Sequence, residues 1–98
     1  MEVSEFMKLV EKNTKPKGVG DDVVGSRVIY QFMNYIFVID YDPYCEREEK
    51  LVAITNAHNN EFIYVNKALA SVFPGLSLLH NKKVLDDIAC KLEFRQWP

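Results

Sequence analysis

The sequence predicts an α+β fold, in which an N-terminal helix and two C-terminal helices pack on a small antiparallel sheet of about four strands. Apolar residues recur at helical spacing near both ends of the chain, and a run of β-branched and aromatic residues lies between them. The 98 residues suit one hydrophobic core but not two, so we expect a single α+β domain over 1–98.

The first helix is predicted from four apolar residues that share one helical face. They are Val3, Phe6, Met7 and Val10. The helix has to end by Thr14 and Lys15, because Pro16 disfavours the helical conformation in the residue before it. Glycine and aspartate dominate the stretch 17–22, which predicts an exposed loop there.

Two strands are predicted within 26–41, because this stretch is rich in β-branched and aromatic residues. Asn34 tolerates a positive φ, so Met33 and Asn34 are expected to form a tight turn between the strands. One long bent strand would use the same residues. Pro43 is expected to end the second of these strands.

Two more strands are predicted over 51–55 and 61–65, and the polar residues 57–60 between them suit a hairpin loop. The sequence therefore predicts about four antiparallel strands, joined mostly by short connections.

Two helices are predicted in the C-terminal part. Asn66 is a favourable N-cap for a short helix over 67–73, which Pro74 ends. Asn81 is expected to cap the last helix in the same way. One apolar stripe marks that helix. It consists of Val84, Leu85, Ile88, Ala89 and Leu92.

Residues 51–69 resemble the opening hairpin and first helix of PAS sensor domains, including the step through Tyr64, Val65 and Asn66 into the helix. A PAS domain continues with more helix and three further long strands, and the chain after Phe73 is too short to supply them. The resemblance implies a shared hairpin-to-helix arrangement and not ligand sensing.

Charge is distributed unevenly along the chain. The net charge is −2, which argues against binding to the nucleic-acid backbone as the main activity. The N-terminal region is basic, while residues 40–49, which we call the acidic segment, hold five acids and only Arg47 in opposition. The basic residues are Lys8, Lys12, Lys15 and Lys17, and the acids are Asp40, Asp42, Glu46, Glu48 and Glu49.

Neither cysteine has the pattern of a catalytic or structural site. Cys45 lies in a polar stretch and Cys90 in the last helix, so we expect both to remain reduced. The glutamates around Cys45 disfavour a thiolate, which argues against a catalytic role for this residue.

The remaining motifs do not predict a metal, cofactor or phosphate site. Asp40 and Asp42 share a strand face, and Asp21 and Asp22 are adjacent, but such carboxylates are usually solvated. The glycines in 18–20 lack the preceding strand and the Lys-Ser/Thr that a phosphate-binding loop needs. We expect no cofactor and no metal.

Two alternatives to protein binding stay open. His58 and His80 are the only histidines, and one proton acceptor with one proton donor would suit a small ribonuclease. The other alternative is a non-catalytic accessory or structural subunit that pairs through an exposed strand edge.

The leading hypothesis is a protein-binding inhibitor and not an enzyme. Tyrosines beside charge are typical of protein interfaces, and an acidic surface fits a basic protein partner. The expected partner-binding residues are Asp40, Tyr41, Asp42, Tyr44, Glu46, Glu48 and Glu49. In size and charge the chain resembles bacterial immunity proteins, which implies an antitoxin that occludes the basic active site of a nuclease-type toxin.

No catalytic residues and no direct contact with nucleic acid are expected for such an inhibitor. The first ten residues have neither a secretory nor a transit-peptide pattern, and no apolar run is long enough to span a membrane. We therefore expect a cytoplasmic protein.

Overall fold

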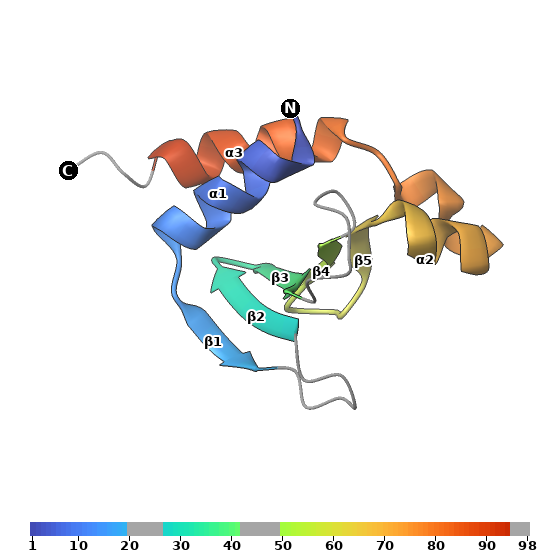
Figure 1. Ribbon diagram of the computed structural model, residues 1–98, viewed down its shortest axis with the longest axis horizontal. Coiled ribbons are helices and arrows are strands. Elements are labelled where there is room, and N and C mark those ends of the chain that lie inside the picture. Colours follow the sequence, from blue (N-terminus) through green and yellow to red (C-terminus); the bar gives the residue numbers. More distant parts are fainter. Residues whose placement is uncertain (20–26, 42–49, 95–98) are drawn as a thin grey trace.

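The computed structural model describes residues 1–19, 27–41 and 50–94 (Figure 1), and it has the predicted α+β fold with five strands in place of about four. In chain order the elements are α1 (Val3–Asn13), β1 (Pro16–Val19), β2 (Arg27–Phe32), β3 (Tyr35–Asp40), β4 (Leu51–Asn56), β5 (Phe62–Val65), α2 (Lys67–Val72), the 3₁₀ helix η1 (Pro74–Leu79) and α3 (Lys83–Phe94).

The sheet is an antiparallel meander in the order β1-β2-β3-β4-β5. The turn predicted between β2 and β3 is confirmed, because Phe32 pairs with Tyr35 and leaves a two-residue loop. The positive φ falls on Met33, at 53°, and not on Asn34 as the sequence suggested. The hairpin between β4 and β5 is confirmed as well, and the Ala57 N–H donates to the Asn34 carbonyl at 2.8 Å, which links the two hairpin loops.

The prediction of a loop over 17–22 is wrong for residues 17–19, which belong to β1; residues 20–22 lie outside the described part of the chain. Pro16 and Gly18 led to the loop prediction. A proline is tolerated at the first position of an edge strand, because no neighbouring strand needs its missing N–H. The register shift between Pro16 and Gly18 accommodates both residues in a short, irregular strand.

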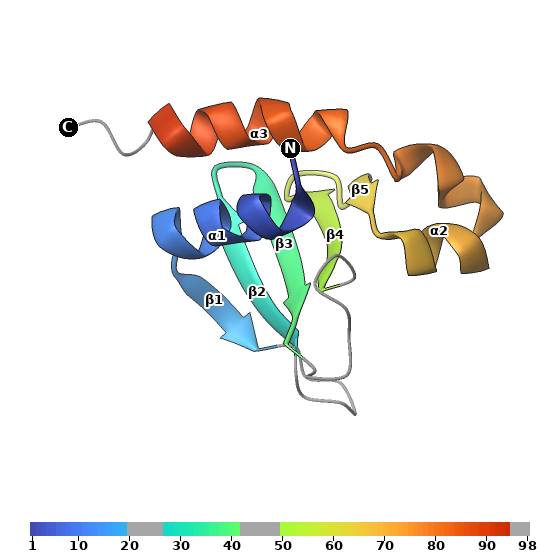
Figure 2. The same cartoon turned by 45° about the horizontal axis from the view of Figure 1, so that its top comes forward.

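Two helices, α1 and α3, lie side by side over one face of the sheet (Figures 1 and 2). Both bury the faces that the sequence predicted, and their apolar side chains meet those of the inner sheet face in one core. The helical core residues are Val3, Phe6, Met7, Val10, Leu85, Ile88, Ala89 and Leu92. From the sheet come Tyr30, Phe32, Phe37, Ile39, Leu51, Ile54 and Tyr64.

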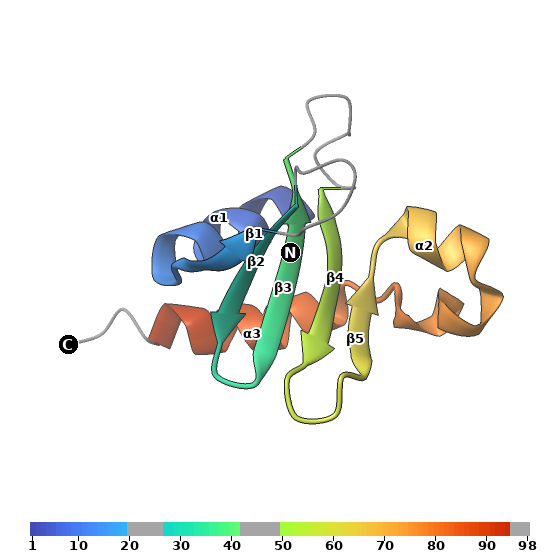
Figure 3. The same ribbon diagram turned by 90° about the horizontal axis from the view of Figure 1, so that it is seen from below.

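The remaining helices, α2 and η1, lie at the β5 border of the sheet (Figure 3). Both predicted caps are confirmed: the Asn66 side chain accepts from the Leu69 N–H at 2.9 Å, and the Asn81 side chain accepts from the Lys83 N–H at 3.0 Å. Pro74 ends α2 as expected but also begins η1, which the sequence analysis missed. A proline suits the first turn of a helix, where the N–H has no partner within the helix.

Candidate functional site

The acidic segment begins at the last residue of β3. Only Asp40 and Tyr41 of its predicted binding residues lie within the described part of the chain. The other five lie outside it: Asp42, Tyr44, Glu46, Glu48 and Glu49. The Asp40 N–H donates to the Lys50 carbonyl at 2.6 Å, so the connection between β3 and β4 leaves and re-enters the sheet at a single point.

Asp40 lies on the outer face of the sheet, which is the face away from α1 and α3. It is paired in register with Arg27, and the Arg27 Nε lies 3.9 Å from a carboxylate oxygen of Asp40. Together with Val52 and the α2 residues Leu69 and Val72, among others, they line a hollow of about 250 Å³. Asp40, the one acid of the acidic segment that lies within the described residues, therefore borders a hollow between the sheet and α2.

Tyr41 points to the opposite side, toward α1. Its half-buried ring packs against the core, and its hydroxyl donates to the Glu11 carboxylate at 2.9 Å. The hydroxyls of Tyr30 and Tyr41 lie 2.6 Å apart, and since Tyr41 gives its single proton to Glu11, Tyr30 is the donor in this pair. Asp40 and Tyr41 therefore lie on opposite faces of the sheet, and one flat partner surface cannot cover both.

The pKa of Tyr41 is raised well above its ordinary value of 10.0, first by burial and then by the hydrogen bonds with Tyr30 and Glu11. The folded protein consequently keeps this proton at a pH where the unfolded chain has lost it. The stability linked to Tyr41 is fully present below about pH 10 and falls as the pH rises further.

We expect Tyr41→Phe to lower the free energy of unfolding by about 1 kcal/mol at pH 8, because the variant cannot bond to Glu11. The difference from the unaltered protein should narrow above about pH 10, since phenylalanine has no proton to lose. Urea unfolding at several pH values measures both effects. If the difference in free energy of unfolding between the two proteins stayed constant above about pH 10, stability would not be linked to the hydroxyl proton of Tyr41.

The two histidines lie at opposite ends of β5. His58 is exposed in the loop before β5, whereas the His80 ring is half-buried, with Nδ1 3.0 Å from the carbonyl of Val65 at the other end of the strand. A strand rises roughly 3.3 Å per residue, so about 10 Å of β5 separates them. The ribonuclease alternative therefore has no site that both histidines share.

Other reactive side chains do not gather in the described residues. Cys90 is exposed on α3, and Cys45 lies outside the described part of the chain. Within residues 1–19, 27–41 and 50–94, no group of three or more His, Cys, Asp or Glu side chains is placed to hold a metal ion.

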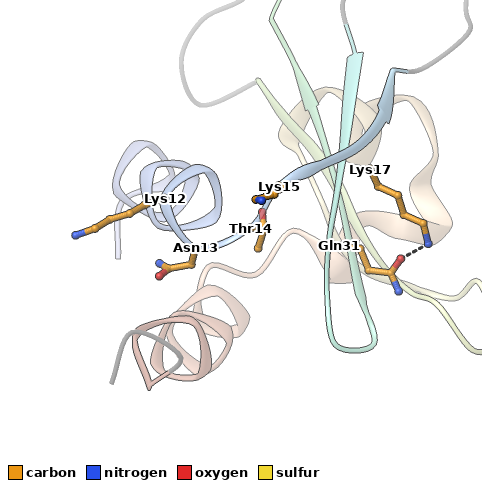
Figure 4. A pocket seen from close by; sticks show the side chains of 6 residues that line it. All are labelled: Lys12, Asn13, Thr14, Lys15, Lys17 and Gln31. Atoms are coloured by element: carbon orange, nitrogen blue, oxygen red, sulfur yellow. Dashed lines mark hydrogen bonds between the residues drawn. The ribbon is translucent and has the colours of Figure 1, made fainter. Parts of the chain in front are cut away.

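A basic hollow of about 550 Å³ lies where α1 joins β1 (Figure 4). Lys12, Lys15 and Lys17 line it, but Lys12 points away from the other two and the Lys17 ammonium donates to the Gln31 side chain. Its polar side chains are also occupied, because Asn13 and Thr14 donate to the carbonyls that end α1, at 2.8 and 2.7 Å. The lysines do not converge on one anion.

The outer face of the sheet is a surface that the sequence analysis missed. No described helix crosses it, and α2 only flanks it (Figure 3). Because successive side chains alternate between the two faces of a strand, the outward positions can be named. They include Ile29, Gln31, Ile36, Val38, Thr55 and Phe62. Each of the four strands β2 to β5 places at least one apolar side chain on this face, because Ala53 of β4 pairs with Val38.

A signal for this surface was present in the sequence. A strand with one wet face alternates apolar and polar residues, whereas 28–30 and 35–39 are continuously apolar or aromatic. Such runs predict two apolar faces. The helices α1 and α3 cover only one of them.

None of the helices in the described residues is long and apolar enough to cross a membrane. Comparison with models of protein families, with curated proteins and with solved structures found no match. The function has to be inferred from the residues of this chain.

Proposed function

We propose that this chain is a small protein-binding inhibitor that occludes a basic site on a partner protein. The model for this activity is a bacterial immunity protein that neutralises a nuclease-type toxin in the cytoplasm. The five acids of the acidic segment would take the place of substrate phosphates, and Tyr44 would fill a pocket at the centre of the contact.

The observation that carries this proposal is the base from which the acidic segment leaves the sheet. A hydrogen bond joins Asp40, the first residue of the segment, to Lys50, the residue that follows it, and the Tyr41 hydroxyl bonds to Glu11 on α1. A fixed base lowers the conformational entropy that a binding segment loses when it meets its partner. Five acids within ten residues of sequence also form a dense negative charge, which speeds encounter with a basic surface.

Tyr41 has a supporting part in this proposal and not the anchoring part first expected. Its hydroxyl is bonded to Glu11 and its ring packs on the core, so it positions the segment. Asp40 shares the outer sheet face with Arg27, which reduces the charge that Asp40 presents to a partner. The four acids from Asp42 to Glu49 are therefore the main candidates for contact with a basic site.

A pull-down tests the proposal. The tagged protein is recovered from cells that also express the products of the neighbouring genes, and retained proteins are identified by mass spectrometry. We expect stoichiometric capture of a basic protein whose activity is blocked when the purified inhibitor is added. Recovery of the tagged protein alone, or of a partner whose activity does not change, would contradict inhibition.

A further inference from the structure

We propose that the C-terminal segment of this chain, residues 95–98, docks in a hollow at the end of α3 and places the indole of Trp97 there. Residues 95–98 lie outside the described part of the chain. Three observations point to them as the occupant: the chemistry of the hollow, the exposure of its apolar side chains, and the short connection from its wall to Trp97. The inference is independent of the proposed function.

The hollow has a volume of about 590 Å³ and lies between α3 and the turn that joins β2 and β3. Its described lining residues are Met33, Asp87, Cys90, Lys91 and Phe94. The four from α3 follow one another at the i, i+3, i+4 and i+7 spacing, which puts their side chains on one face of the helix. None of them belongs to the face that α3 buries against the sheet. The hollow is therefore a second surface of α3, outside the core.

The lining suits an aromatic side chain. Met33 and Cys90 each carry a sulfur atom, and sulfur atoms make favourable contacts with aromatic rings. Phe94 adds a ring of its own. The charges of Asp87 and Lys91 are opposite, and the Lys91 ammonium already donates to the Tyr35 hydroxyl at 2.8 Å. A hollow with balanced charges favours a neutral ring over an ionic ligand.

Two apolar side chains of the lining gain no burial from the described residues. Met33 is 65% exposed and Phe94 is 77% exposed. Met33 has a φ of 53°, in the left-handed region where glycine and asparagine are favoured, so methionine does not help the turn. A group that covers the hollow would remove apolar surface of both residues from water, which is favourable.

Trp97 is tethered next to this hollow. It follows Phe94 by three residues, and three extended residues reach about 10 Å. Cys90 lies about one helical turn, or about 6 Å, back along α3 from Phe94. The connection is therefore long enough to bring the indole over Cys90. It is also short, so the effective concentration of Trp97 at the hollow is in the millimolar range, which favours it over a free ligand.

Fluorescence quenching tests the docking, because Trp97 is the only tryptophan of the chain. We expect acrylamide to quench its emission about threefold less efficiently in the folded protein than in urea, since the lining shields a docked indole. Met33→Asn should abolish this protection. Asparagine suits the left-handed φ of the turn, so the variant should fold.

The matched control is Leu78→Asn, because Leu78 is 89% exposed on η1 and does not line the hollow. Its quenching should equal that of the unaltered protein, and circular dichroism establishes that both variants are folded. Equal quenching of the unaltered protein with and without urea would mean that the indole is exposed. Protection that survives Met33→Asn would mean that it packs elsewhere. Either result would overturn the inference.

Dilution distinguishes docking within one chain from exchange between copies. The protection should be constant from about 1 to about 100 µM protein, because the tether fixes the effective concentration. Protection that is lost on dilution would mean that Trp97 of another copy fills the hollow, which also overturns the inference.

Alkylation of Cys90 gives a second test that does not use fluorescence. The described residues leave Cys90 exposed, and a docked indole would cover it. Trp97→Ala should therefore speed the reaction of Cys90 with iodoacetamide about threefold, since thiol reactivity depends on access. Peptide mass spectrometry follows Cys45 in the same sample as the internal control, and its rate should not change. An unchanged rate at Cys90 would contradict the docking.

These tests are separate from that of the proposed function, because none of the variants changes the acidic segment. An exposed Trp97 would remove the docking and leave inhibition standing. A shielded Trp97 in a chain that captures no basic partner would do the reverse.

Discussion

Phe37→Ala is expected to lower the free energy of unfolding by about 3 to 5 kcal/mol, the cost of removing a fully buried aromatic side chain. Phe37 is 0% exposed in the middle of β3, and its ring meets that of Phe6 on α1 edge to face, with centroids 5.8 Å apart. A domain of this size has a total stability of roughly 5 kcal/mol. The variant should therefore retain only about 0 to 2 kcal/mol, so that up to about half of its molecules are unfolded, while the unaltered protein is almost entirely folded.

Urea unfolding followed by circular dichroism measures this loss, and Phe94→Ala is the matched control. Phe94 is 77% exposed on α3, so the same substitution there should change the stability by less than about 0.5 kcal/mol. Equal effects at the two positions would contradict the packing of α1 on the sheet. A urea midpoint for Phe37→Ala equal to that of the unaltered protein would contradict this packing as well.

Much of the fold could be predicted from the sequence, because its strongest signals are local. The apolar residues of α1 and α3 recur at helical spacing, and this pattern fits only a helix with one buried face. The capping role of Asn66 also follows from a short-range rule, since its side chain has to reach only the Leu69 N–H. These predictions needed no knowledge of distant contacts.

The strand β1 could not be predicted in this way. Pro16 and Gly18 favour a loop locally, and the strand exists because β2 offers unpaired backbone groups along its edge. That opportunity depends on the tertiary arrangement, which the sequence of 16–19 does not contain. The 3₁₀ helix η1 is similar, since Pro74 ends one helix and equally well begins another.

The candidate sites were less predictable than the fold, because sequence spacing does not say which side chains share a surface. Asp40 and Tyr41 are neighbours in sequence but lie on opposite faces of the sheet. His58 and His80 are separated by the length of β5. The outer face shows the converse, because Ile36 and Phe62 are distant in sequence but belong to one cross-strand row on the same face.

Reversing two charges, with Glu48→Lys and Glu49→Lys together, is expected to weaken binding to a captured basic partner by at least tenfold at low ionic strength. Five acids and one arginine give the acidic segment a net charge of −4, and replacing two of those acids with lysines brings it to zero. Loss of this charge should act mainly on the association rate, because long-range attraction steers the encounter. Surface plasmon resonance with immobilised partner separates association from dissociation.

The salt dependence and a matched control decide whether the segment itself is the contact. The defect should shrink from about 50 to about 500 mM salt, since screening already removes much of the attraction felt by the unaltered protein. Asp87→Lys with Glu93→Lys alters the net charge of the whole chain by the same amount on exposed positions of α3. That variant should bind nearly as well as the unaltered protein, because the field of the acidic segment is intact. Equal losses of binding in both variants would mean that the total charge of the chain, and not the acidic segment, attracts the partner. Unchanged binding after Glu48→Lys and Glu49→Lys would exclude the segment as the interface.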